Sequence, residues 1–205
     1  LVLYDLPVGP HTAVVNFPGN TQYDDAENST DFEVYAKKAS EVTVKVESIT
    51  VGQNATIRVN ITKGATGSVT IVLAGHEYTS EVNSTTGEVT FNIENLTARN
   101  YVVTAIYHGD TYYNSNSSDA KFTVSKLASS VDLEVKDILV GETEIINVTV
   151  TPGATGVVLI NISGTCYYAD LGNGMPTFTI GGLRPGNYEA VVTYLGDNKY
   201  SDSTA

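Results

Sequence analysis

The chain has 205 residues, of which 41% are apolar and 17% are charged, so it is long enough for two ordinary domains and is not of disordered composition. Its formal charge of −12, with only 11 Lys and Arg residues, argues against a nucleic-acid partner, because phosphate binding needs clustered basic side chains. No apolar run approaches the roughly 20 residues of a membrane helix.

Alternating apolar residues mark seven short stretches in the middle of the chain, which is the pattern of half-buried β-strands. We name these predicted strands A to G in chain order. Their inward positions are Val42, Val44 and Val46 in A; Ile57, Val59 and Ile61 in B; Val69, Ile71 and Leu73 in C; Tyr78 and Val82 in a weaker D; Val89, Phe91 and Ile93 in E; Tyr101, Val103, Ala105 and Tyr107 in F; and Phe122 and Val124 in G.

The pattern repeats along the chain. The sequence Gly-Ala-Thr-Gly at residues 64–67 returns unchanged at residues 153–156, 89 positions later. A Tyr-x-Gly-Asp-x-x-Tyr motif ends at Tyr113 and again at Tyr200, and residues 17–23 are a variant of it. This period is too long for a solenoid and suits a small sandwich domain.

Seven short strands joined by turns rich in Gly, Asn and Thr predict an all-β fold of tandem immunoglobulin-like Greek-key β-sandwiches, arranged as a rod. We expect residues 1–39 to form a partial repeat with strands E, F and G only. We expect residues 40–126 to form a complete repeat, and residues 127–205 to form a repeat that stops before its last strand.

A three-stranded apolar piece stays ordered only when it is packed against something. One hypothesis is that the segment around Phe32 and Val34 covers the open edge of the last repeat in another copy of the chain, as in strand addition. The alternative is that contacts between neighbouring molecules order the end of an arbitrarily bounded segment.

A structural motif is expected at the start of each predicted strand F. The sequence leading to Tyr188 resembles a tyrosine corner, in which the Tyr hydroxyl bonds to backbone a few residues upstream. Tyr101 occupies the equivalent position in the middle repeat, and His11 occupies it in the first segment. Either the imidazole of His11 makes a similar bond or that corner is weaker.

Eight Asn-x-Ser/Thr sequences are candidate N-glycosylation sites, and such sites require solvent-facing positions. Three of them fall at outward positions of predicted strands, and the other five fall in predicted turns or hairpins. The alternative is that Asn, Ser and Thr simply suit turns and exposed strand faces. The candidates are Asn28, Asn54, Asn60, Asn83, Asn95, Asn116, Asn147 and Asn161.

No catalytic, cofactor-binding or metal-binding residue is assigned, and we do not expect an enzyme. The three histidines share no repeat-equivalent position, and His108 is expected to be a solvated turn residue. Cys166 is the only cysteine, so it has no intramolecular disulfide partner.

Two weaker features have alternative interpretations. Asp110 and Asp197 follow a Gly in the F–G turn, and the first segment has an acidic pair at residues 24–25. These acids either bind calcium at repeat junctions or support the turn, and the turn is favoured because too few oxygens converge. The tyrosine pairs at 112–113 and 167–168 either stack on sugars or, as we favour, pack on a sheet.

The ordered combination of Val51-Gly52, Gly-Ala-Thr-Gly, the corner Tyr and the Gly-Asp turn resembles the bacterial and archaeal Ig-like repeats of adhesin-like surface proteins, most similarly those of methanogenic archaea. Departures are His11 at the corner and Arg99, where the other segments have Gly9 and Gly186. The resemblance implies an extracellular, often glycosylated stalk at the cell surface, with its anchor elsewhere.

The leading functional hypothesis is therefore a non-catalytic stalk that projects a binding region or mediates adhesion. One alternative is a subunit of an extracellular filament assembled head-to-tail by β-strand complementation. Another is a carbohydrate-binding accessory module of a secreted protein. The expected partners are neighbouring repeats or copies of the chain itself, and surface glycans or another cell; no cofactor is expected.

Overall fold

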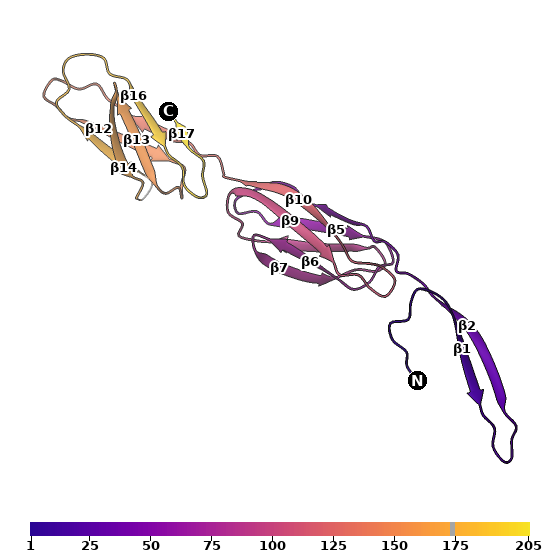
Figure 1. Ribbon diagram of the computed structural model, residues 1–205. Coiled ribbons are helices and arrows are strands. Elements are labelled where there is room, and N and C mark those ends of the chain that lie inside the picture. Colours follow the sequence, from indigo (N-terminus) through magenta and orange to yellow (C-terminus); the bar gives the residue numbers. More distant parts are fainter. Residues whose placement is uncertain (173–174) are drawn as a thin grey trace.

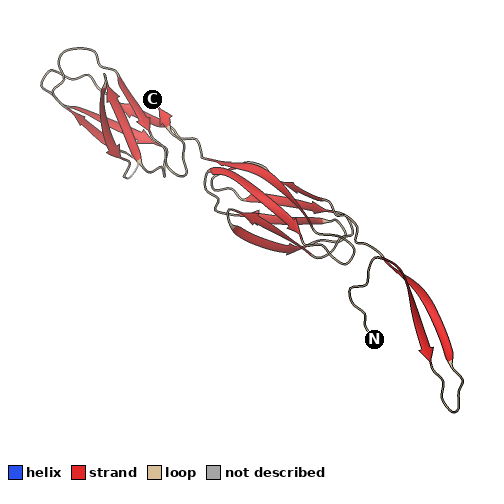
Figure 2. Ribbon diagram, in the orientation of Figure 1, coloured by secondary structure: helices blue, strands red, loops and turns tan. Residues whose placement is uncertain are grey.

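The computed structural model describes residues 1–172 and 175–205, and the regular elements in these residues are all β-strands (Figure 2). A hairpin at the N-terminal end is followed by two sandwiches, and the three parts succeed one another along an extended line (Figure 1). The all-β, immunoglobulin-like prediction is thereby confirmed. Among the described residues, no helix has the length and apolar character that a membrane span requires.

The N-terminal hairpin consists of β1 (Gly9–Phe17) and β2 (Ala26–Val34), which pair antiparallel along their whole length. They correspond to predicted strands F and G. The expected strand E is not found, because residues 1–8 form no strand. The hairpin has no facing sheet, and Phe17 and Phe32 remain 42% and 41% exposed.

The middle repeat is a complete sandwich. One sheet has the order β3 (Val42–Lys45), β5 (Ala55–Ile61), β8 (Glu88–Ile93). The other has the order β4 (Ile49–Thr50), β10 (Asn116–Ser125), β9 (Arg99–Tyr107), β6 (Ser68–Leu73), β7 (His76–Glu81). These are the seven predicted strands with one addition, the two-residue β4, which lies parallel to the end of β10.

The core of this sandwich follows the predicted alternation. In β5, Ile57 and Val59 are fully buried, whereas Thr56 before them and Arg58 between them are exposed. From the facing sheet, Ile71 and Tyr107 fill the same interior. Burial of each such side chain contributes about 1.5–3 kcal/mol, so the alternate apolar residues are the main source of the fold's stability.

The predicted inward position of Tyr78 is wrong. β7 pairs with β6 at the edge of the five-stranded sheet rather than beside β8, and Tyr78 is 37% exposed there. Val82, just beyond β7, does pack partly against the core. The reason is local: the Ala74-Gly75 turn between β6 and β7 has positive φ at both residues, which makes a tight hairpin and keeps the two strands in one sheet.

The last repeat has the same plan. One sheet has the order β11 (Val131–Glu134), β12 (Glu144–Val150), β15 (Thr177–Ile180), and the other β14 (Thr165–Asp170), β13 (Val157–Ile162), β16 (Ala190–Tyr194), β17 (Ser203–Thr204). The repeat was expected to stop before strand G. Instead β17 pairs with β16 where strand G begins in the middle repeat.

Candidate functional site

The F–G turn of the middle repeat is organised by one carboxylate. Oδ1 of Asp110 accepts hydrogen bonds from the backbone N–H groups of Tyr112 and Tyr113, both at 2.7 Å. Oδ2 accepts from the backbone N–H of Thr66 at 2.7 Å and from its hydroxyl at 2.9 Å. Asp110 therefore ties the F–G turn to the loop between β5 and β6.

The last repeat contains the same clamp. Asp197 accepts from the backbone N–H groups of Lys199 and Tyr200 at 2.7 and 2.6 Å, and from the N–H and hydroxyl of Thr155 at 2.9 and 2.8 Å. A buried tyrosine supports each loop from the other side. Tyr107 donates to the Thr66 carbonyl oxygen at 2.9 Å, and Tyr194 donates to the Thr155 carbonyl oxygen at 2.8 Å.

The threonines of the two clamps are not recognisable as hydrogen-bonding residues from the sequence pattern alone. A signal for them was present, since Thr66 and Thr155 stand in the unchanged Gly-Ala-Thr-Gly sequence, and the Gly-Asp turn recurs with it. The following Gly67 has φ of +86°, and a Cβ on it would lie 3.0 Å from the Gly109 carbonyl oxygen. The close approach of the two loops therefore requires glycine at that position.

The clamps shift the pKa values of their own members. Partial burial opposes ionisation of Asp110 and Asp197, but the hydrogen bonds from backbone N–H groups and threonine hydroxyls outweigh it and hold both carboxyl pKa values well below the usual range. Burial, together with the nearby aspartate charge, raises the pKa of Tyr107 to about 12, and the pKa of Tyr194 likewise to about 12.

This geometry favours turn support over calcium binding at these positions. The two Asp110 carboxylate oxygens already accept four hydrogen bonds. A cation would need the same oxygens as ligands. In the hairpin, the equivalent residue is Asn20, whose Oδ1 accepts from the N–H groups of Gln22 and Tyr23 at 2.8 and 3.0 Å. The acidic pair at 24–25 follows that turn and does not form it.

The same turns hold the segment that leads into each repeat. The N–H of Lys38 donates to the Tyr112 carbonyl oxygen at 2.8 Å, the N–H of Asn114 donates back to Lys38 at 2.9 Å, and the Ser40 hydroxyl donates to Asn114 at 2.8 Å. Ser40 is only 6% exposed. The chain is thus fixed to the middle repeat before its first strand begins.

In the last repeat Leu127 makes the same pair of backbone bonds, with Lys199 at 2.8 Å and Ser201 at 2.9 Å, and the Ser129 hydroxyl donates to Ser201 at 2.7 Å. The preceding repeat is paired up to Ser125, whose carbonyl oxygen accepts from Val51 at 2.9 Å. Between the two paired positions lies one residue, Lys126.

The corner residues all bond four residues upstream. The hydroxyls of Tyr101 and Tyr188 donate to the carbonyl oxygens of Thr97 and Arg184, each at 3.1 Å, and His11 Nε2 lies 2.7 Å from the Pro7 carbonyl oxygen. The imidazole therefore takes the place of the phenol in this bond. The three corners differ in burial: Tyr101 is 5% exposed, whereas Tyr188 is 44% exposed.

A strand G residue accounts for the difference. Tyr101 stacks on Phe122, with ring centroids 5.3 Å apart, and His11 stacks on Phe32 at 5.4 Å. Beside Tyr188 there is instead a hollow of about 800 Å³, lined in part by Leu139, which is 74% exposed. The hollow lies at one end of the last repeat. In the middle repeat, β10 covers the corresponding end.

The structure places none of the eight candidate glycosylation asparagines in the core: two are half-buried and six are exposed. Asn28 lies inside β2 rather than in a turn, and Asn116 is the first residue of β10. Two use their amide nitrogen as a donor, Asn54 to Glu94 and Asn116 to the Ser40 carbonyl oxygen. The half-buried pair is Asn60 and Asn161, and the exposed six are Asn28, Asn54, Asn83, Asn95, Asn116 and Asn147.

The tyrosine pairs separate into packed and exposed members. Tyr113 and Tyr167 pack partly against the two cores, whereas Tyr112 and Tyr168 are 70% and 67% exposed and belong to different repeats. The two exposed rings therefore do not form one aromatic platform.

His108 departs from the expected purely solvated role. Its Nε2 lies 2.8 Å from the Thr70 hydroxyl, which also lies 2.8 Å from the Thr79 hydroxyl. This links the start of the F–G turn to the edge of the five-stranded sheet. Cys166 is exposed on β14.

Three solved structures illustrate the similarity in fold. The fibronectin(III)-like modules of Clostridium thermocellum CbhA are 14% identical, over 80% of this chain and 91% of theirs, with a TM-score of 0.35. A 1.5-MDa bacterial ice-binding adhesin is 17% identical over 83% of this chain and 65% of its own, with a TM-score of 0.36. The BSP domain of a biofilm-associated protein is 17% identical over 80% of this chain and 27% of its own, with a TM-score of 0.29.

No curated protein matches the chain significantly. One sequence family does match, and it covers the middle sandwich from its first strand to its last. Residues 42–125 match the family described as Bacterial Ig-like domain (group 3).

Proposed function

We propose that the chain is a non-catalytic stalk segment of an extracellular, adhesin-like surface protein, in which successive sandwiches act as a semi-rigid spacer. The observation that carries this proposal is the junction between the two sandwiches. Ser125 is paired in one repeat and Leu127 in the next, so Lys126 alone connects them. A one-residue connection has few conformations, whereas a flexible linker needs several unpaired residues.

Each repeat reinforces the junction from its own side. The clamp made by Asp197 shapes the turn on which Leu127 docks, so the lead-in segment is held by the same residues that hold the loop at Thr155. With these bonds in place, bending at the junction is confined to the backbone torsions around Lys126. A stalk with such joints resists collapse and keeps its distal end away from the surface.

The extracellular setting is supported by the candidate glycosylation sites. All eight lie on exposed or half-buried positions of a strongly acidic surface, with a formal charge of −12. A glycan needs room outside the fold, and none of the eight asparagines would have to leave the core to carry one. Acidic charge of this size also favours solubility outside the cell.

Small-angle X-ray scattering tests the stalk. The protein is expected to give an elongated pair-distance distribution with a well-defined maximum dimension. A variant with Gly-Gly-Ser-Gly-Gly inserted after Lys126 is expected to give a broader, shorter distribution. The same insertion in the turn between β6 and β7, which lies inside a repeat, is the control and should leave the dimensions unchanged. Identical curves for the protein and the Lys126 insertion would contradict a semi-rigid junction.

A second candidate function is a filament subunit, and one specific observation favours it. β2 carries Phe32 and Val34 at the positions that Phe122 and Val124 hold in β10, and a hollow of about 800 Å³ lies beside Tyr188. β2 of one copy would pair with β16 of another only after displacement of β1, which holds the same edge of β2, and Phe32 would then be buried against the tyrosine corner. Residues 35–37 would connect the last repeat of one copy to the middle repeat of the next.

Analytical ultracentrifugation decides between the two functions. A filament requires concentration-dependent assembly that is abolished by Phe32→Asp, which places a charge in the hollow. Thr30→Asp, two residues earlier on the same face, is a milder control. A monomer at all concentrations would remove this candidate and leave the stalk unaffected.

A further inference from the structure

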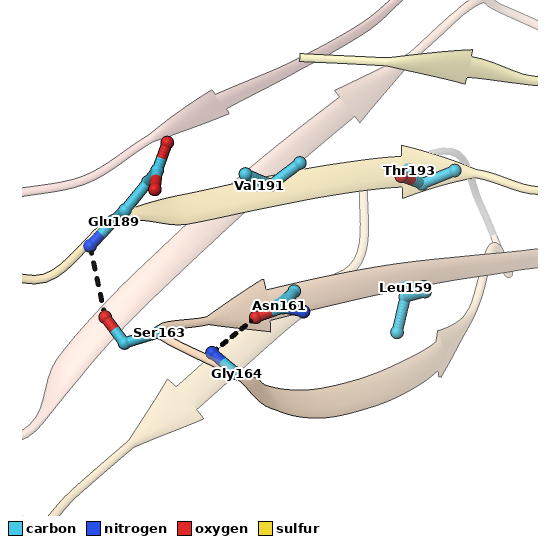
Figure 3. Close-up of a pocket in the computed structure, with 7 residues that line it drawn as sticks. All are labelled: Leu159, Asn161, Ser163, Gly164, Glu189, Val191 and Thr193. Carbon is cyan, nitrogen blue, oxygen red and sulfur yellow. Dashed lines mark hydrogen bonds between the residues drawn. The ribbon is translucent and has the colours of Figure 1, made fainter.

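The outer face of the last repeat carries a hollow at one of the candidate glycosylation sites. It has a volume of about 480 Å³ and is lined by residues of β13 and β16, with Asn161 among them (Figure 3). Pairing of the two strands sets Asn161 opposite Val191 and Leu159 opposite Thr193, so these four side chains share one face. Val191 is 36% exposed, which leaves an apolar surface open to solvent.

The Asn161 side chain is held in one orientation. Its Oδ1 accepts a hydrogen bond from the Gly164 N–H at 2.8 Å, and the amide nitrogen is turned the other way, toward Leu159 (Figure 3). The nitrogen is the atom that a glycan would modify. Ser163, the hydroxyl residue of the Asn-Ile-Ser sequence, is itself held by the Glu189 N–H at 3.4 Å.

An aromatic ring lies at the edge of this surface. β14 pairs with β13 on the side away from β16, and Tyr168 stands opposite Leu159 on the same face. Tyr168 is 67% exposed, so its ring is available to a ligand. The flat apolar face of a tyrosine ring offers a surface on which the apolar face of a pyranose ring can pack.

The middle repeat shows that this arrangement is not a general property of the fold. At the position of Leu159 it has Thr70, which bonds to His108 and Thr79 and fills the face with polar contacts. At the position of Asn161 it has Val72. The last repeat thus has Leu159 beside a glycosylation sequence, whereas the middle repeat has a hydrogen-bonded threonine and no glycosylation sequence at this place.

We propose that Asn161 carries an N-linked glycan whose first sugar lies on the surface formed by Leu159, Tyr168 and Val191. In the transfer, Nδ2 of Asn161 bonds to C1 of a sugar supplied by a lipid-diphosphate-linked donor. The bond from C1 to the diphosphate breaks, the lipid diphosphate leaves, and one Nδ2 proton passes to a base of the transferase. The remaining Nδ2–H and the sugar then sit on the outer face without disturbing the Gly164 bond.

This inference rests on the proposed extracellular setting and adds a specific site to it. The experiment uses the whole chain secreted from a eukaryotic host, with occupancy of each sequence measured by peptide mass spectrometry and the glycans trimmed to a single N-acetylglucosamine. We expect Asn161 to be occupied. We also expect nuclear Overhauser contacts between the sugar and the Tyr168 ring or the Leu159 methyl groups.

Thermal unfolding gives the second readout. The trimmed glycoprotein should melt a few degrees above Ser163→Ala produced in the same way, because Ser163→Ala removes the glycosylation sequence but keeps the bond between Asn161 and Gly164. The double variant Leu159→Thr, Tyr168→Ala keeps the glycosylation sequence but removes the sugar's surface, and it should lose that increment, judged against its own Ser163→Ala version. Asn60→Gln is the matched control, because Asn60 is half-buried like Asn161 but lies on an outer strand face between Thr43 and Glu88.

Two results would overturn the proposal. One is an unoccupied Asn161, whether or not other sites are occupied. The other is an occupied Asn161 whose stabilising increment persists in the double variant. Neither result bears on the stalk, which is tested by scattering on protein without glycans, so the two failures can be told apart.

Discussion

Asp110 and Asp197 each join two loops through a single side chain. Aspartate serves this purpose because both of its oxygens accept, whereas an asparagine offers one acceptor and one donor. Asn20 shows the smaller role in the hairpin, where it accepts from its own turn. The residue type therefore follows the number of donors that converge on it.

Stability is expected to fall in acid through these two groups. Their folded pKa values are depressed below the ordinary 3.8, so the unfolded chain takes up protons first as the pH drops. The stabilising contribution is present above about pH 4 and is lost as the pH falls through and below that value. Urea unfolding between pH 6 and 2 measures it.

The double variant Asp110→Asn, Asp197→Asn is the comparison. It should be less stable at neutral pH, because each amide turns a donor toward donors already in place, and its stability should depend less on pH below 5. Equal acid sensitivity of the two proteins would show that other carboxylates are responsible.

The buried tyrosines Tyr107 and Tyr194 are expected to limit the stability of the fold at high pH. The pKa values of Tyr107 and Tyr194 are raised to about 12, whereas an unfolded tyrosine ionises near 10. Their contribution is complete below pH 10 and is lost as the pH rises toward 12. Denaturant unfolding of Tyr107→Phe should show lower stability at pH 7 and a shallower decline above pH 10, with Tyr112→Phe, an exposed ring, as the control.

Among the elements, strand G shows what a facing sheet contributes. Phe122 in β10 is 4% exposed and Phe32 in β2 is 41% exposed, although the two occupy equivalent positions. Phe122→Ala should destabilise the middle repeat by about 3–5 kcal/mol, as is usual for a buried phenylalanine. Phe32→Ala should leave the unfolding transition of that repeat unchanged.

Guanidinium unfolding followed by tyrosine fluorescence or circular dichroism measures both variants. A cost below about 1 kcal/mol for Phe122→Ala would mean that β10 does not close the sandwich as the structure shows.

The elements also show where sequence patterns reach their limit. Alternation predicted the positions of β5, β8 and β9 correctly, because each of these strands has one face on the core. It was wrong for Tyr78, because β7 is exposed at every residue except the half-buried Ser80, and the sheet that this strand joins depends on the turn before it. The missing strand at residues 1–8 has a related cause: a strand with no partner is not stable alone.

At the scale of the whole molecule, the two connections differ in length. Residues 35 and 36 separate β2 from Lys37, whose side chain donates to the Asp110 carbonyl oxygen, whereas Lys126 alone separates the sandwiches. A protease needs several residues in extended, unpaired conformation, so the first connection is the more accessible.

Limited digestion with proteinase K, which has little sequence preference, should therefore cut first at residues 35–36 and release the hairpin, with the two sandwiches still joined. Cleavage at Lys126 should be slower by at least about tenfold, since local opening of its anchored neighbours must come first. Mass spectrometry of the early fragments measures the order. Earlier cleavage at Lys126 would contradict a stiff junction.

The candidate sites were predictable to different degrees. The corner residues and the glycosylation sequences are local signals, and Tyr101 or Asn161 can be found by spacing alone. Only the turn role of Asp110 could be predicted from the sequence. Its bonds to Thr66 could not, because the two residues are 44 positions apart and meet only when two loops fold together. The surface beside Asn161 was not visible at all, since Leu159, Tyr168 and Val191 come from three strands.

The sequence by itself determined the strands, their inward faces and the repetition of the fold, because alternation and turn residues act within a few positions of the chain. The tertiary structure decided which sheet each edge strand joins, what the aspartates bind and how short the junction is. Those properties depend on distances between segments far apart in the sequence, and only the packed sandwich sets them.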